Sequence, residues 1–259
     1  MTAHASLYLH YAVRSDPGPI RSNNEVAAYA DTRVLAIADG MGGHPAGEVA
    51  ASLMVRSFGH ESDVSEGDVV DHLRAATFNG EDAIIDYVAK HPETSGMGTT
   101  LTAVRLEGDR LGLLHAGDSR AYLLRSGVLY QLSHDDTFVQ SLVDQGVLSR
   151  NEARVHPQRN VVLRALTGRE TRFSLANFEV REHDRLLLCS DGVSDVLTDD
   201  EITEALTDQG AEASAEVLMR LALLRGATDN VTCIIADVVA REPRAAPFII
   251  ATHTAIAHV

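Results

Sequence analysis

Three aspartates each stand where a run of apolar residues meets a turn. They are Asp39 in LAIADG, Asp191 in LLLCSDG and Asp229 in DNVTCIIA. A short apolar run bounded by glycine is typical of a buried strand, so each carboxylate is expected at a strand end. Hard divalent cations such as Mg²⁺ and Mn²⁺ take oxygen ligands, mostly carboxylates, carbonyls and water. Three such carboxylates, far apart in the sequence, predict one shared cation site.

Further oxygen ligands are available near these aspartates. The backbone carbonyl of Gly40 directly follows Asp39, and Glu25 and Asp118 are additional acids close to expected strand ends. A single aspartate before a glycine is most often a turn residue, but five acids at strand ends are harder to explain in that way. The sequence contains neither an HExxH nor a CxxC pattern that would favour zinc instead.

The elements that position these acids come in separate blocks of strands and helices. We expect strands over Leu7–Val13, Val26–Ala30, Leu35–Ala38, Arg172–Val180, Arg185–Ser190 and Asn230–Ala240. An antiparallel meander is predicted over Thr99–Leu106, Arg110–His115, Ala121–Arg125 and Val128–Leu132. Helices are expected over Ala46–Gly59, Asp68–Lys90, Asp135–Gln145, Ser149–Val155, Asp199–Thr207 and Ala211–Arg225. Such blocks indicate an α+β fold with mostly antiparallel sheets.

Composition narrows the class of protein. The chain has 259 residues, of which 45% are hydrophobic, enough for one large domain or two small ones. Its formal net charge of -15 disfavours nucleic acid and anionic membranes as partners. Lys90 is the only lysine, which excludes a GxxxxGK[ST] phosphate loop. Cys189 and Cys233 lie in apolar runs, where we expect small core residues in a reducing compartment.

Eight motifs carry a resemblance to a known family. In chain order they are RSNNE at 21–25, DGMGGH at 39–44, GMGTT at 96–100, GDSR at 117–120, HDDTFV at 134–139, LRALTG at 163–168, SDGVSD at 190–195 and DNVT at 229–232. In these motifs the chain resembles the PPM (PP2C-type) metal-dependent protein serine/threonine phosphatases, in particular the bacterial branch. It is similar to the actinobacterial members that oppose membrane-anchored Ser/Thr kinases.

The resemblance implies a fold and a set of metal ligands. The expected fold is an α-β-β-α sandwich, in which two packed antiparallel sheets are flanked by helices and the metal site lies at one edge. Two Mn²⁺ or Mg²⁺ ions would be bridged by Asp39, and Asp191 and Asp229 would complete the first ion's shell. The second ion would be served by the Gly40 carbonyl and by Glu25, directly or through water. A third, weaker ion would lie between Asp118 and Asp191.

The resemblance also implies how a substrate is handled. Water activated by the two cations would attack the phosphorus of phosphoserine or phosphothreonine in proteins. Arg21 would hold the phosphate, because its planar guanidinium meets two phosphate oxygens at once. His44 or a metal-bound water would protonate the leaving alkoxide, and an exposed loop histidine without a chemical role is the alternative for His44. Residues 134–160 match the variable flap beside the site.

These interpretations give a set of expectations for the whole chain. Residues 1–240 form the phosphatase domain, and residues 241–259 form a short C-terminal tail without a transmembrane helix. The protein is expected to be a cytoplasmic monomer that acts on phosphorylated proteins and opposes their kinases, without binding nucleic acid or inserting into a membrane. The actinobacterial members commonly continue into a linker, a membrane helix and an outer domain. This chain is therefore either a stand-alone phosphatase or a piece of a longer protein.

One position departs from the family pattern. Many members have an aspartate after the RxxNE stretch, where this chain has Val26. Valine cannot accept a hydrogen bond from a metal-bound water, so we expect a weaker second metal site. Val26 also favours, slightly, the alternative of a degenerate member that binds phosphoproteins without turnover. A two-metal nuclease is the other alternative, and the net charge of -15 argues against it.

Overall fold

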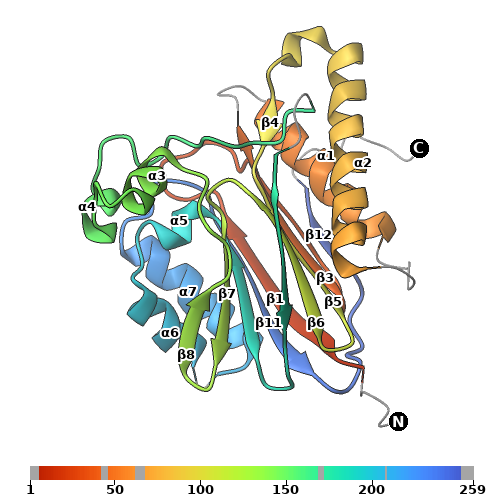
Figure 1. Cartoon of the computed structure of the whole chain (residues 1–259), viewed down its shortest axis with the longest axis vertical. Helices are drawn as coiled ribbons and strands as arrows, with labels where there is room; N and C mark the ends of the chain where they lie inside the picture. The colour runs from red at the N-terminus through yellow and green to blue at the C-terminus, as the bar shows by residue number, and fades with distance from the viewer. Residues whose placement is uncertain (1–5, 42–45, 62–67, 169–171, 208, 252–259) are drawn as a thin grey trace.

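The chain folds into two antiparallel sheets packed face to face, with helices on both outer sides. The computed structural model describes residues 6–41, 46–61, 68–168, 172–207 and 209–251 (Figure 1). The five-stranded sheet has the order β1 (Tyr8–Asp16), β11 (Val231–Val239), β10 (Arg185–Cys189), β7 (Arg120–Arg125) and β8 (Val128–Gln131). The seven-stranded sheet has the order β12 (Phe248–Ile250), β2 (Val26–Ala30), β3 (Val34–Met41), β5 (Leu101–Glu107), β6 (Arg110–Ala116) and β9 (Ser174–Glu179), with β4 (Gly98–Thr99) beside β3.

The helices divide between the two outer faces. The seven-stranded sheet is covered by α1 (Ala46–Glu61) and α2 (Val69–Lys90), which is followed by the short 3₁₀ helix η1 (Pro92–Thr94). The five-stranded sheet is covered by α5 (Asp191–Ser194), α6 (Asp199–Leu206) and α7 (Ala211–Leu224). The remaining helices, α3 (Phe138–Asp144) and α4 (Arg150–Arg154), lie beside the sandwich (Figure 1). This architecture confirms the expected α+β sandwich.

Strand β3 shows how the layers are built from the sequence. Leu35 and Ile37 face the core between the sheets, whereas Ala36 and Ala38 pack in the core beneath α1. The side chains of a strand alternate between the two faces, and both faces of β3 are covered by protein. The strand is therefore apolar along its whole length until Asp39, which marks the point where it leaves the core.

The predicted meander is wrong, because its two hairpins belong to different sheets. β5 and β6 pair in the seven-stranded sheet, whereas β7 and β8 pair in the five-stranded sheet. The chain crosses between the sheets at Gly117, Asp118 and Ser119. Gly117 has a φ of +117°, and a Cβ there would lie 2.5 Å from the Cβ of Thr100, so glycine is required for the crossing. Asp118 thereby reaches the gap between the sheet edges.

The segment after residue 240 adds a strand to the fold. β12 pairs antiparallel with β2 at the edge of the seven-stranded sheet, where Ile249 lies opposite Tyr29. The Tyr11 hydroxyl donates a 2.6 Å hydrogen bond to the carbonyl of Ala246, which fixes the segment leading into this strand. The expected tail therefore includes ordered sheet structure up to residue 250. No helix among the described residues is both long and apolar enough to cross a membrane.

Arg185 holds together the strand that leads into Asp191. Its guanidinium forms two contacts with the carboxylate of Asp237 on β11, at 2.6 and 3.1 Å. It also donates to the carbonyl of Leu206 at 2.5 Å and to the hydroxyl of Ser214 at 3.0 Å. Only 11% of the Arg185 side chain is exposed, so these partners replace most of its hydration. One side chain thus connects β10 to β11, α6 and α7.

The change Arg185→Met is expected to lower the free energy of unfolding by about 2–3 kcal/mol, because it removes charged hydrogen bonds from a nearly buried position. Urea denaturation would measure the loss. The matched control is Arg74→Met, which removes an exposed ion pair with Asp71 within α2 and is expected to cost less than about 1 kcal/mol. Equal losses in the two variants would contradict a special role for Arg185.

Candidate metal centre

The strand ends of both sheets open into one cleft of about 710 Å³. β3 contributes Asp39 and Gly40 to its wall, and the crossing between the sheets contributes Asp118. The other predicted residues come from the start of α5, from the loop before β11 and from the loop before β2; they are Asp191, Asp229, Arg21 and Glu25. The structure thus brings together every predicted site residue that it describes. His44 lies outside the described residues.

The carboxylates of the cleft repel one another. Burial, followed by the charges of Asp118, Asp229 and Glu25, raises the pKa of Asp39 well above its usual value. Burial, followed by the charges of Asp39 and Asp118, likewise raises the pKa of Asp191 well above its usual value. For Asp118, burial is the largest cause that raises the pKa to about 7. The negative charge of these carboxylates is therefore not balanced by the positive charge around them.

The donor set fits hard divalent cations. Every candidate side-chain ligand is a carboxylate oxygen, and the Oδ1 atom of Asp191 is inaccessible to solvent with no hydrogen-bond partner among the described residues. In the described part of the chain, no three His, Cys, Asp or Glu side chains gather closely enough to hold one ion by themselves. Mg²⁺ commonly binds through one or two carboxylates and keeps several waters, so water would have to complete the shell of any ion held here.

Backbone contacts fix Asp39 at the cleft. The backbone N–H of Asp39 donates to the hydroxyl of Thr100 at 3.0 Å, and its carbonyl accepts from the Thr99 hydroxyl at 2.9 Å and the Thr100 N–H at 2.8 Å. Next to it, Gly40 and Gly47 bring the end of β3 against the first turn of α1. A Cβ on Gly40 would lie 2.2 Å from the backbone of Gly47, which no larger residue permits. This contact explains why Gly40 and Gly47 are glycines.

Asn230 is a positioning residue that sequence reasoning did not single out. Its side-chain oxygen accepts from the N–H of Glu25 at 2.9 Å, and its amide nitrogen donates to the carbonyls of Pro17 and Asn23, both at 2.9 Å. The side chain therefore ties the loop that carries Arg21 to the start of β11. The available signal was its place directly after Asp229 in the DNVT motif.

Arg21 lies at the wall of the cleft and contacts one of the candidate ligands. Its Nη2 atom donates to Oδ2 of Asp229 at 2.6 Å, and 53% of the Arg21 side chain is exposed. The hydrogen bond to Asp229 is the main cause that raises the pKa of this guanidinium further above its usual value. The group is therefore a fixed positive charge within a cleft that is otherwise acidic.

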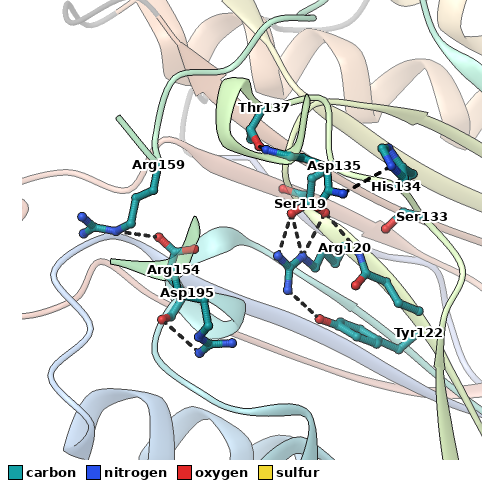
Figure 2. A network of polar contacts seen from close by, with 12 residues as sticks. Ser119, Arg120, Tyr122, Ser133, His134, Asp135, Thr137, Arg154, Arg159 and Asp195 are labelled. Carbon is teal, nitrogen blue, oxygen red and sulfur yellow. Dashed lines mark hydrogen bonds and ion pairs between the residues drawn. The ribbon is translucent and has the colours of Figure 1, made fainter. Parts of the chain in front are cut away.

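Side-chain contacts brace the start of α3 and the backbone that follows Asp118. The hydroxyl of Thr137 caps α3 by accepting from the N–H of Gln140 at 3.1 Å. Asp135 accepts from Arg120 at 2.9 and 2.6 Å (Figure 2), because a largely buried guanidinium requires a charged partner. Arg120 directly follows the crossing, so this pair stiffens the backbone that presents Asp118.

Val26 faces the same side of its sheet as Asp39. The two residues lie directly opposite each other in the β2–β3 register, and Val26 is fully buried in the core between the sheets. Its side chain is apolar and belongs to the core between the sheets, so it offers no hydrogen-bond acceptor beside Asp39.

Comparisons with known proteins agree with this geometry. The family model described as protein phosphatase 2C matches residues 25–225. The chain is 52% identical over 238 residues to the serine/threonine protein phosphatase PstP of Mycobacterium tuberculosis, covering 92% of this chain and 46% of PstP. It therefore spans about half the length of that relative. It is 33% identical over 242 residues to the serine/threonine phosphatase stp of Listeria monocytogenes, covering 88% of this chain and 96% of stp.

Solved structures match the fold over nearly the same region. The crystal structure of M. tuberculosis PstP gives a TM-score of 0.87 at 51% identity, covering 90% of this chain and 99% of that one. A second structure, of the PstP catalytic domain in complex with two manganese ions, gives a TM-score of 0.85 at 50% identity and the same coverage. The superposition confirms the arrangement of the two sheets and their helices.

Without divalent cations, the free energy of unfolding is expected to fall as the pH rises from about 4 to 8. The folded pKa of Asp118, about 7, lies above its usual value of 3.8, so its contribution is complete below the unfolded pKa and is lost as the pH rises through 7. Thermal unfolding in a chelator measures this slope, and Asp118→Asn should flatten it. Mn²⁺ should raise the melting temperature more at pH 8 than at pH 5, because protons compete for the same carboxylates. A pH-independent melting temperature would contradict this account.

Proposed function

The chain belongs to the protein phosphatase 2C family, and we propose that it hydrolyses phosphoserine and phosphothreonine in proteins with the help of two Mn²⁺ or Mg²⁺ ions. The observation that carries this proposal is the cleft in which repelling carboxylates surround a single exposed guanidinium. Such a cleft has the charges to hold cations and a phosphate together. The manganese-bound structure of the PstP catalytic domain supports the proposal.

In this proposal the ligands keep the roles expected from the sequence. Asp39 would bridge two ions, Asp191 and Asp229 would serve the first, and the Gly40 carbonyl and Glu25 would serve the second; Asp118 with Asp191 would hold a third. A pair of such ions supplies a water that is acidic enough to attack phosphorus near neutral pH. Positive charge at this place relieves the repulsion that raises the pKa values of Asp39 and Asp191.

The residues of the chain itself orient the substrate. Arg21 is the cationic side chain of the cleft wall, and its fork of N–H groups matches phosphate oxygens two at a time. Asn230 fixes the loop on which Arg21 stands, so the guanidinium is held in place before the substrate arrives. The thermodynamic benefit is that little conformational freedom is lost when the phosphate binds. Protonation of the leaving alkoxide stays assigned to His44 or to a metal-bound water.

The partners follow from the same chemistry. Phosphorylated proteins and the Ser/Thr kinases that modify them are the proposed partners, and the cytoplasm is the proposed location of a monomeric enzyme. The net charge of -15 disfavours nucleic acid as a substrate, which argues against a two-metal nuclease. A second candidate function, binding of phosphoproteins without turnover, is favoured by one observation: buried Val26 stands opposite Asp39 where an acceptor would support the second ion.

Mn²⁺-dependent hydrolysis of a phosphothreonine peptide tests the proposal. We expect turnover to fall by more than about 100-fold in Asp39→Asn and Asp191→Asn, because each variant removes a direct metal ligand. Even the loss of a residue that only hydrogen-bonds a ligand lowers metal affinity or activity by about 10–100-fold. Asp86→Asn, an exposed position on α2, is the matched control and should retain full activity. No turnover at saturating Mn²⁺ by the folded wild-type protein would favour the phosphoprotein-binding function.

The Val26→Asp variant tests the weakness of the second metal site. The new carboxylate would lie beside Asp39, so we expect it to lower the Mn²⁺ concentration at half-maximal activity by about 10-fold. In the metal-free protein the same change should reduce stability, because it adds a charge to a buried, acidic edge. Metal titration of activity and thermal unfolding in chelator measure the two effects. Unchanged half-saturation and turnover would contradict the assignment.

A further inference from the structure

A second hollow lies behind the metal centre, between the flap and the five-stranded side of the fold. This cavity of about 320 Å³ is bounded by α3 and α4 on one side and by α5 and the start of α6 on the other. Asp118, Asp191 and Asn160 line both this cavity and the cleft. The two hollows thus share residues of the metal centre and of the end of the flap (residues 134–160).

The flap is joined to the rest of the described fold by polar contacts at its base and at its tip. At the base, the N–H of Asp136 donates to the carbonyl of Gly117 at 2.7 Å, and Asp135 binds Arg120. At the tip, Nη2 of Arg154 donates to the carbonyl of Leu197 at 2.8 Å. It also donates to the carbonyl of Asp195 at 3.3 Å (Figure 2). The tip therefore rests on the segment that directly follows α5.

Two arginines near the flap tip, Arg154 and Arg159, contact the segment after α5, and the contact made by Arg154 is the stronger. The carbonyls of Asp195 and Leu197 lie in the turn between α5 and α6, and a guanidinium binds such groups with charged hydrogen bonds. Arg154 makes two such bonds from a half-buried position. Arg159 reaches the Asp195 carboxylate at 3.7 Å with 43% of its side chain exposed, and exposed pairs of this kind contribute little.

The flap also shapes the cleft where a substrate would lie. Asn160, at its end, lines the cleft together with Val162, which forms an isolated bridge with Thr137. The stretch from Arg154 to Asn160 is short, so a shift of the tip moves the cleft wall. A phosphate bound in the cleft would instead face Arg21 and the carboxylates, none of which belongs to the flap.

We propose that Arg154 is a positioning residue that clamps the flap tip to the end of α5 and thereby sets the cleft wall for the peptide part of the substrate. This inference rests on the proposed phosphatase function. It assigns recognition of the polypeptide, rather than of the phosphate, to a contact outside the cleft. Hydrolysis of a small phosphate ester should not depend on the clamp, whereas hydrolysis of a phosphopeptide should.

Steady-state kinetics with two substrates tests the clamp. In Arg154→Met we expect the KM for a phosphothreonine peptide to rise about 10-fold, the effect of one charged hydrogen bond, with kcat little changed. Turnover of p-nitrophenyl phosphate should stay within about twofold. Arg154→Lys keeps one donor and should restore part of the peptide affinity. Arg150→Met is the matched control, because Arg150 stands on the same helix and lines the same cavity without any hydrogen bond or ion pair to a described residue.

Limited digestion with trypsin provides a readout that does not depend on activity. Cleavage after Arg159 should be faster in Arg154→Met than in Arg150→Met, because an unclamped tip opens more often. Equal cleavage rates together with an unchanged peptide KM would overturn the clamp, and so would a parallel loss with both substrates. If the wild-type protein hydrolyses neither substrate, the proposed function fails, and the cleavage comparison still decides whether Arg154 holds the flap.

Discussion

Mutual repulsion among the carboxylates at one edge of the sandwich is the constraint on which the rest of the structure depends. Acids that raise one another's pKa values would separate if they stood on flexible loops. Here they stand at the ends of buried strands and at the start of a helix, where the two sheets and their helices hold them. The packing of three apolar cores therefore holds the carboxylates together against their repulsion. A cation bound at this edge would neutralise that negative charge and so relieve the repulsion.

The acids of the site could be predicted because each one interrupts an apolar run. Asp39, Asp191 and Asp229 end or begin strands that are buried on both faces, so the change from apolar to charged is abrupt in the sequence. The same burial hides which sheet a strand belongs to. β6 and β7 are both buried on both faces and therefore do not alternate, so the crossing at Asp118 was read as a turn within one meander.

Other features depend on contacts between distant residues, which no local pattern contains. Strand β12 is only three residues long and partly exposed, and it exists because β2 offers a free edge. Asn230 acts on a loop more than 200 residues earlier in the chain. Arg120 and Asp135 lie in two separate motifs of the sequence, and burial forces them to pair. Long-range polar pairing is the part of this site that residue types and spacing do not determine.

The placement of the flap links it to the metal centre at both of its attachments. Its base is bonded to Gly117, the neighbour of Asp118, and its tip is bonded to the carbonyl of Asp195, one helical turn after Asp191. Each attachment is thus within four residues of a carboxylate that lines both hollows. Cations bound by Asp118 and Asp191 would fix the backbone to which the flap is attached, because both attachments lie close to these carboxylates in the sequence. Metal binding would therefore also support the wall that faces the peptide part of a substrate.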